Sequence, residues 1–202
     1  MVVAHIVIEG PIGVGKTSLS RLLAEELDAQ LVLEVVEENP FLAPFYHDPE
    51  SYAFKVQVFF LLSRYRQLLD LNQGALFVEH VVSDYLFDKD AIFASLNLSG
   101  AEWELYQELY RQLSPKLSPP DLVVHLRAEP DLLLQRIAAR GRPFERDLDA
   151  GYLRRLSRAY NDHFRHYPGR VLSLDAAAYD YVANPADRVA IVNRVLGAAK
   201  AA

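Results

Sequence analysis

The 202-residue chain contains no cysteine, which excludes disulfide bridges and thiolate metal sites. It also lacks any apolar run near the roughly 18 residues of a membrane-spanning helix, so we expect no membrane contact. The first residues enter an apolar strand pattern without a basic leader, which predicts no signal peptide. These absences together favour a cytoplasmic protein.

An excess of basic residues is missing as well. The chain has 21 Lys and Arg against 27 Asp and Glu, a formal net charge of −6, which argues against nucleic-acid binding. Its six histidines are scattered and predict no metal cluster. With 51% hydrophobic residues, the length suits one domain with a full core, and we expect a single domain over residues 1–202.

The most informative stretch that is present matches G-x-x-x-x-G-K-[ST], the phosphate-binding P-loop. It lies between a strand pattern and a helix pattern, a setting that argues against a chance match. Backbone N–H groups and the helix N-terminus bind phosphate there, the lysine reaches the outer phosphates, and the hydroxyl ligates Mg²⁺. We therefore predict nucleotide-phosphate binding with Mg²⁺ as cofactor, and the motif leaves open where the phosphate goes. The predicted ATP-binding residues are Gly10, Pro11, Ile12, Gly13, Val14, Gly15, Lys16, Thr17 and Ser18.

Short apolar segments alternate with helical patterns along the chain. Strands are predicted at 2–8, 31–36, 76–83, 122–126 and 171–174, and helices at 18–27, 51–72, 88–98, 101–113, 130–140, 150–166 and 185–196. This alternation is typical of an α/β fold with a five-stranded parallel sheet covered by helices on both faces. Ligands bind such sheets beyond the carboxyl ends of the strands, where the P-loop lies.

Two carboxylates at this edge are candidates for chemistry. Glu34 lies near the end of the second strand, where it can take a proton from an acceptor hydroxyl; the alternative is a solvated acidic turn, since Glu37 and Glu38 are close by. Asp84 follows the third strand, the usual place of a carboxylate beside Mg²⁺. Asp84 could instead cap a helix, and Glu79 competes for its role if the strand ends earlier.

Gln57 and Arg64 lie seven residues apart on the long predicted helix and share a face with apolar neighbours. Polar groups on a buried face are costly unless paired. They therefore contact either the polar edge of a nucleobase or other groups of the protein.

Arginines crowd the end of one predicted helix and the loop after it. Arg136 and Arg140 share a helix face, and Arg142 and Arg146 follow. On a mobile segment, arginines can close over phosphates and stabilise the charge of the transferring group. We predict a lid at about 140–149; the alternative is a solvated basic helix end that favours the helix dipole.

The ordered set of motifs resembles the deoxyribonucleoside kinases over nearly the whole chain, in particular the bacterial deoxyguanosine, deoxyadenosine and deoxycytidine kinases. The motifs are 10–18, 34–37, Phe45-Tyr46 with Gln57, 62–64, 84–93, and 140–142 with Glu145. The resemblance implies a P-loop kinase fold, a homodimer, and transfer of phosphate from ATP to the 5′-hydroxyl of a deoxynucleoside in nucleotide salvage.

The resemblance also implies residue roles. Glu34 would be the general base, Gln57 and Arg64 would read the nucleobase with an aspartate nearby, and Tyr46 and Glu145 would hold the 3′-hydroxyl. The predicted catalytic residues are Lys16, Glu34, Arg136, Arg140 and Arg142. The predicted substrate-binding residues are Glu34, Tyr46, Gln57, Arg64, Asp84, Asp90, Phe93 and Glu145, and the predicted Mg²⁺ ligands are Thr17 and Asp84.

Two positions depart from the family. Asn39 stands where several relatives have a tryptophan near the nucleobase. The family also usually has arginine directly after the acidic residue at Asp84. Here that position is Tyr85. Either another cation takes the place of this arginine, for example a lid arginine, or the segment Glu79-His80 is the true match.

The acceptor decides among the possible functions. Arg64 is the only cation among the candidate acceptor residues, which favours an uncharged nucleoside over a nucleoside monophosphate. A purine deoxynucleoside is favoured, with a deoxycytidine-preferring or broad kinase as the alternative. An ATP-dependent switch is the non-enzyme alternative; a guanine-specific switch would carry Asn-Lys-x-Asp, which the sequence lacks.

Overall fold

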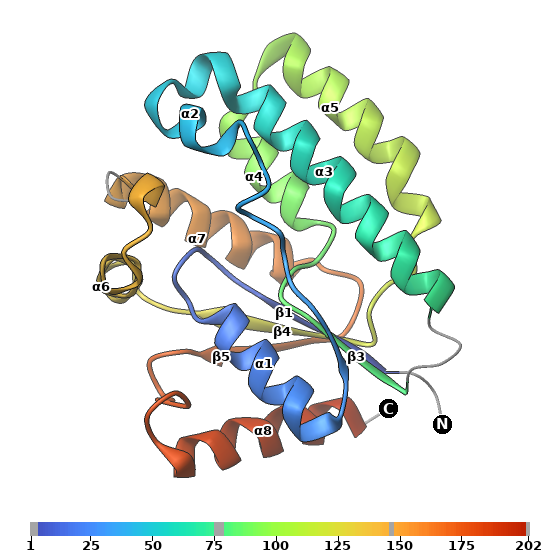
Figure 1. Cartoon of the computed structure of the whole chain (residues 1–202), viewed down its shortest axis with the longest axis vertical. Coiled ribbons are helices and arrows are strands. Elements are labelled where there is room, and N and C mark those ends of the chain that lie inside the picture. Colours follow the sequence, from blue (N-terminus) through green and yellow to red (C-terminus); the bar gives the residue numbers. More distant parts are fainter. Residues whose placement is uncertain (1–3, 75–78, 146–147, 201–202) are drawn as a thin grey trace.

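Five parallel strands form the centre of the molecule, in the order β2-β3-β1-β4-β5 (Figure 1). The computed structural model describes residues 4–74, 79–145 and 148–200. The strands are β1 (Ala4–Glu9), β2 (Gln30–Val32), β3 (His80–Ser83), β4 (Leu122–Arg127) and β5 (Val171–Asp175). The predicted parallel five-stranded α/β fold is confirmed. Residues 1–3, 75–78, 146–147 and 201–202 lie outside the described residues. They include parts of the first and third predicted strands and, with Arg146, part of the predicted lid.

Helices cover both faces of the sheet, as predicted. They are α1 (Lys16–Leu27), α2 (Leu42–His47), α3 (Pro49–Gly74), α4 (Lys89–Asn97), α5 (Gly100–Leu113), α6 (Pro130–Arg140), α7 (Ala150–Arg165) and α8 (Pro185–Lys200), with short 3₁₀ turns η2 (Ser114–Lys116) and η3 (Pro143–Glu145). Among the residues that the structure describes, no helix is long and apolar enough to cross a membrane.

Alternate residues of the central strands serve opposite faces, because side chains alternate along a strand. Ile6 and Ile8 of β1 belong to the core under α1, α6 and α8. Val7, between them, packs with residues of α4 and α7 on the other face. A further apolar cluster joins α3 and α5 to α4 and β3. These two long helices therefore pack on the same side of the sheet as α4 (Figure 1).

The second strand is shorter than the predicted segment 31–36. It ends at Val32, beside the end of β3, and the next residues leave the sheet. The Asp84 backbone N–H donates to the Val32 carbonyl at 3.2 Å, and the Glu34 N–H donates to the Asp84 carboxylate at 2.8 Å. Glu34 is therefore held beyond the strand by a side chain, which a strand pattern does not reveal.

Candidate active site

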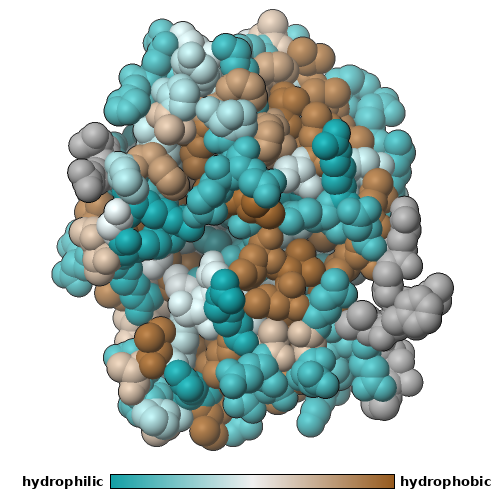
Figure 2. All heavy atoms as spheres, viewed as in Figure 1, coloured by the Kyte–Doolittle hydropathy of each residue, from teal (hydrophilic) through white to brown (hydrophobic). Residues whose placement is uncertain are grey.

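A cavity of about 800 Å³ opens at the carboxyl edge of the sheet, a size typical of small-molecule sites. Figure 2 shows a recess near the middle of this face, bordered by hydrophilic residues. The predicted residues that line the cavity are Ile12, Gly13, Gly15, Lys16, Thr17, Ser18, Glu34, Tyr46, Gln57, Arg64, Asp84, Phe93, Arg136, Arg140, Arg142 and Glu145. The wall does not include Gly10, Pro11, Val14 or Asp90, which are buried. Segments far apart in the sequence thus meet where the sheet topology places ligands.

The P-loop turns tightly between β1 and α1. Gly10 has φ +148°, and a Cβ there would lie 2.3 Å from the Leu126 carbonyl oxygen. Gly15 has φ +106°, and a Cβ there would lie 2.3 Å from the Tyr181 hydroxyl. Only glycine fits both the angles and the space, so the loop can bring its N–H groups toward a phosphate.

Lys16 begins α1, and its ammonium folds back over the loop. Nζ donates to the carbonyl oxygens of Gly10 at 2.8 Å and Pro11 at 3.1 Å. Burial lowers the pKa of Lys16 to about 8, and the nearby charge of Lys89 acts in the same direction. Glu9, Glu34 and Asp84 oppose this shift in pKa, and a phosphate at the loop would add further negative charge beside the lysine.

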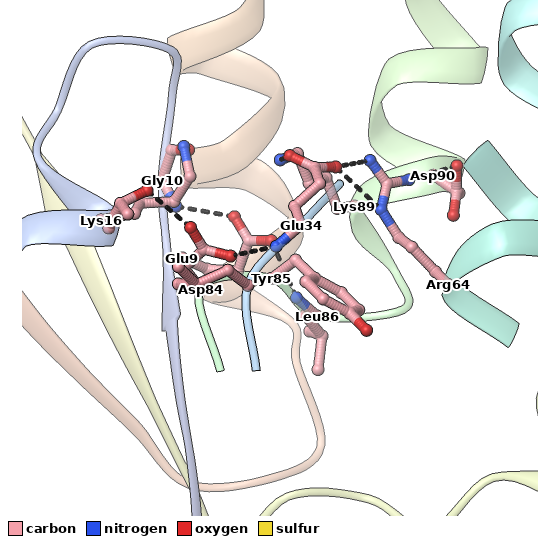
Figure 3. Close-up of polar contacts among 12 residues, drawn as sticks. Glu9, Gly10, Lys16, Glu34, Arg64, Asp84, Tyr85, Leu86, Lys89 and Asp90 are labelled. Atoms are coloured by element: carbon pink, nitrogen blue, oxygen red, sulfur yellow. Dashed lines mark hydrogen bonds and ion pairs between the residues drawn. The ribbon is translucent and has the colours of Figure 1, made fainter. Parts of the chain in front are cut away.

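A buried carboxylate that sequence reasoning missed holds the P-loop in place by hydrogen bonds. Glu9 is fully buried and accepts the Gly10 N–H at 2.8 Å and the Leu86 N–H at 2.9 Å (Figure 3). It ties the P-loop to the segment that follows β3. The signal in the sequence was an acidic residue at the end of an apolar strand, directly before the first glycine.

Thr17 and Asp84, the two predicted Mg²⁺ ligands, both line the cavity and lie in contact. The Thr17 hydroxyl donates to the Asp84 carboxylate at 2.6 Å. Glu79 precedes β3 at the opposite end of that strand, so the alternative register at Glu79-His80 is wrong. The described parts of the chain hold no group of three or more His, Cys, Asp or Glu placed to bind a metal.

Glu34 faces the cavity between two cations. Its carboxylate accepts from the Arg64 guanidinium, with Nε at 3.0 Å, and from the Lys89 ammonium at 2.5 Å (Figure 3). Burial by itself raises the pKa of Glu34, but the charges of Arg64 and Lys89 outweigh it and hold the pKa well below its usual range. With 11% of the side chain exposed, Glu34 is not part of a solvated acidic turn.

Arg64 has ion-pair partners within the protein and also lines the cavity. Its guanidinium pairs with Glu34 on one side and with Asp90 on the other. Asp90 is fully buried behind Arg64, so it meets the cavity only through that guanidinium. Gln57 and Phe93 line the wall beside them.

The arginines around α6 bind other groups of the protein, although the side chains of Arg140 and Arg142 remain 37% and 31% exposed. Arg136 donates to the Val14 carbonyl at 2.9 Å and the Ala176 carbonyl at 3.2 Å. Arg140 forms a bidentate pair with Glu145, with contacts of 2.6 to 3.1 Å. The Arg136 side chain thus joins the P-loop to the segment after β5.

The short turn η3 closes against α2. The Phe144 ring stacks on Tyr46 with ring centroids 5.9 Å apart, and Arg142 pairs with Glu37 at 2.7 Å. Tyr46 and Glu145, predicted to hold one hydroxyl, therefore lie on the same side of the cavity although 99 positions separate them in the numbering.

Sequence reasoning missed two more parts of the wall. Lys89, the first residue of α4, is buried and pairs with Glu34. Sequence reasoning had offered only a lid arginine as the cation that replaces the family arginine at Tyr85. The loop after β5 contributes residues 179–182, and the Tyr181 hydroxyl donates to the Gly15 carbonyl at 3.1 Å. No sequence motif marks this loop.

Comparisons with known proteins agree with this geometry. The family model for deoxynucleoside kinases matches residues 6–198. A deoxyguanosine kinase of Bacillus subtilis is 36% identical over 188 residues, covering 90% of this chain and 91% of the relative. A deoxyguanosine kinase of Lactobacillus acidophilus is 33% identical over 95% of this chain and 89% of its own length.

A solved structure has the same fold over nearly its whole length. A deoxyadenosine kinase from M. mycoides, with dCMP and dCDP bound as products, has a TM-score of 0.83 at 26% identity and covers 96% of this chain and 99% of its own. The match confirms the predicted P-loop kinase fold. The chain therefore belongs to the deoxynucleoside kinase family, whose members phosphorylate deoxynucleosides with ATP.

Proposed function

We propose that this kinase transfers the γ-phosphoryl group of ATP to the 5′-hydroxyl of a purine deoxynucleoside. The observation that carries the proposal is the position of Glu34, which faces the cavity between the phosphate-binding residues Lys16 and Thr17 and the acceptor wall of Tyr46 and Gln57. A carboxylate at this junction suits a proton acceptor for a neutral hydroxyl.

Every bond that forms or breaks in the transfer is accounted for by ATP, the acceptor hydroxyl and Glu34. The 5′-oxygen forms a bond to the γ-phosphorus, its proton passes to the Glu34 carboxylate, and the bond from the γ-phosphorus to the bridging oxygen breaks to release ADP. The strong ion pairs of Glu34 make it a weak base, which is sufficient because phosphoryl transfer depends mainly on positioning and charge stabilisation. Lys16 and the lid arginines 136, 140 and 142 would hold the phosphates.

Thr17 and Asp84 would hold Mg²⁺. A hydroxyl and a carboxylate in contact at 2.6 Å are the hard oxygen ligands that this ion prefers, and Mg²⁺ takes its remaining ligands from phosphates and water. When bound, the ion supplies positive charge to the β- and γ-phosphates.

The acceptor would lie against α2, α3 and η3. Tyr46 and Glu145 both line the cavity there and suit a sugar hydroxyl, while Gln57 and Arg64 offer donors and an acceptor to the edge of a nucleobase. Asp90 would act by orienting Arg64. The names of the two deoxyguanosine kinases support a purine; the dCMP in the M. mycoides enzyme supports deoxycytidine as the alternative.

The larger organisation is proposed on the same basis. Residues 1–202 would form one kinase domain with a lid at about 140–149, and two chains would pair through α3 and α5. Leu62 and Leu105 on these helices are 39% and 52% exposed, and Figure 2 shows hydrophobic residues gathered over them at the upper right. Exposed apolar patches of this kind are typical of protein interfaces.

A panel of four deoxynucleosides with labelled ATP tests the function. We expect kcat/KM to be highest for deoxyguanosine or deoxyadenosine, with the 5′-monophosphate and ADP as products. Preference for deoxycytidine or thymidine would overturn the purine assignment. Faster turnover with deoxynucleoside monophosphates, or ATP consumption independent of any acceptor, would overturn the proposed reaction.

A further inference from the structure

Lys89 occupies a position that the reaction outlined above leaves without a role. It begins α4, its side chain is buried, and it lines the cavity with its ammonium on the Glu34 carboxylate (Figure 3). Lys16 lies close enough that the positive charge of Lys89 lowers its pKa. Lys89 thus stands between the proton acceptor and the phosphate-binding loop.

Glu34 has a second cation besides this lysine. Arg64 already pairs with Glu34, and Asp90 holds Arg64 from behind, so that guanidinium is fixed in place. Lys89 has a flexible side chain. Within the described residues its one ion-pair partner is Glu34, which lies on the cavity side. A buried lysine is costly unless its charge is used, and this one is free to follow a new anion.

The other candidate cations near Glu34 are engaged elsewhere. Tyr85, at the position where the family usually has arginine, is buried with its hydroxyl donating to Gln67 at 2.9 Å. Arg140 is bound to Glu145 and Arg142 to Glu37. Among the described residues, the cations paired with Glu34 are thus Arg64 of α3 and Lys89 of α4, and neither the residue after Asp84 nor a lid arginine takes this place.

We propose that Lys89 is a catalytic residue that changes partner during phosphoryl transfer, from the Glu34 carboxylate to the transferred phosphoryl group. Before transfer it pairs with Glu34. When the acceptor proton passes to Glu34, that carboxylate becomes neutral, and the ammonium is left beside the newly formed phosphate ester, whose oxygens it can bind. No further reactant is needed, because the proton and the phosphoryl group are those of the reaction itself. This inference rests on the proposed function.

The variants Lys89→Met and Lys89→Arg test the role, since methionine keeps an unbranched apolar stem and arginine keeps the charge. We expect Lys89→Met to lower kcat about 10²–10³-fold, the usual effect of removing one group that stabilises transition-state charge. The KM for ATP and the Kd for the nucleoside should change less than about 5-fold. Lys89→Arg should retain at least about a tenth of kcat. Lys116→Met, an exposed lysine on η2, is the matched control and should keep full activity.

A double-variant cycle separates catalysis from support of Glu34. If Lys89 binds the phosphoryl group, Lys89→Met should still lower kcat at least about 10-fold when added to Glu34→Gln, with an unchanged melting temperature marking an intact fold. Wild-type kcat in Lys89→Met, or no added loss in the double variant, would overturn the inference. Failure of the wild-type enzyme to phosphorylate any deoxynucleoside would instead overturn the proposed function.

Discussion

The charge state of Glu34 is set by a few direct contacts. Two cations share its carboxylate, and its own N–H fixes the Asp84 carboxylate that reaches Thr17. Glu34 therefore connects three proposed functional residues: Asp84, which would bind the metal, Arg64, which would contact the nucleobase, and Lys89, which would bind the phosphoryl group. A change of charge at this point affects all three, whereas the fold around it is held by the apolar core.

Glu34→Gln should lower kcat about 10²–10⁴-fold, because an amide cannot accept the proton of the acceptor hydroxyl. ATP affinity should change little, since Lys16 and Thr17 keep their places in the P-loop. Turnover with deoxyguanosine and the Kd for ATP, by titration calorimetry, measure the two effects. Glu38→Gln, an exposed neighbour outside the cavity wall, is the control and should remain fully active. Near wild-type turnover in Glu34→Gln would rule out the base role.

Elements meet at this site through polar groups at their ends. The P-loop follows β1, the Asp84–Leu86 segment follows β3, and α4 begins at Lys89. Glu9 joins the first two by accepting one N–H from each, so it sets the distance between the phosphate-binding loop and the carboxylate opposite it. Its effect on activity is that of a positioning residue.

Glu9→Gln tests this brace. The amide has one acceptor oxygen in place of two, so one buried N–H loses its partner, which should cost about 1–3 kcal/mol of unfolding free energy. We expect the KM for ATP to rise while the Kd for the deoxynucleoside stays within about 3-fold, because the loop moves and the acceptor wall does not. Glu26→Gln, exposed on α1, is the control for charge alone. An unchanged melting temperature and KM for ATP would argue against the brace.

The limits of the sequence-based predictions are clearest at the same element ends. The strand order was not predicted, whereas the P-loop, Asp84 and the five-stranded parallel sheet follow from local patterns and from the alternation of strands and helices. Lys89 does not, because a lysine in the first turn of a helix is ordinarily exposed, and only the topology shows that this turn points at the cavity. The predicted strand at 31–36 was too long since a tertiary contact, Asp84 with the Glu34 N–H, overrides the β-branched pattern.

At the scale of the whole molecule, the proposed dimer would cover the outer face of α3 and α5. Leu105→Glu places a charge on that face, so it should convert the dimer to monomers with little effect on the fold of each chain, because Leu105 is 52% exposed. Light scattering after size exclusion measures the mass. Val189→Glu on α8, at 62% exposure, is the matched control and should leave the dimer intact. A wild-type chain that is monomeric throughout would contradict the proposal.

Global stability should fall as the pH drops below about 6.5, and His125 in β4 is one cause. Burial lowers the pKa of His125 to about 4, with the charges of Arg127 and His163 acting in the same direction. In the unfolded chain the pKa is about 6.5. His125 is neutral in the fold, so its contribution is complete above pH 6.5 and is lost as the pH falls toward 4, by about 2 kcal/mol at pH 5.

His125→Leu removes this titration and should shrink the difference in unfolding free energy between pH 7 and pH 5 by about 2 kcal/mol. Urea unfolding at both pH values measures the difference, which is independent of any uniform change in stability caused by the new side chain. His166→Leu, exposed after α7, should leave the pH dependence as it is. An equal pH dependence in His125→Leu and wild type would show that the buried imidazole is not a source of acid sensitivity, and the remaining dependence would then fall to other groups such as His5, whose pKa burial also lowers to about 4.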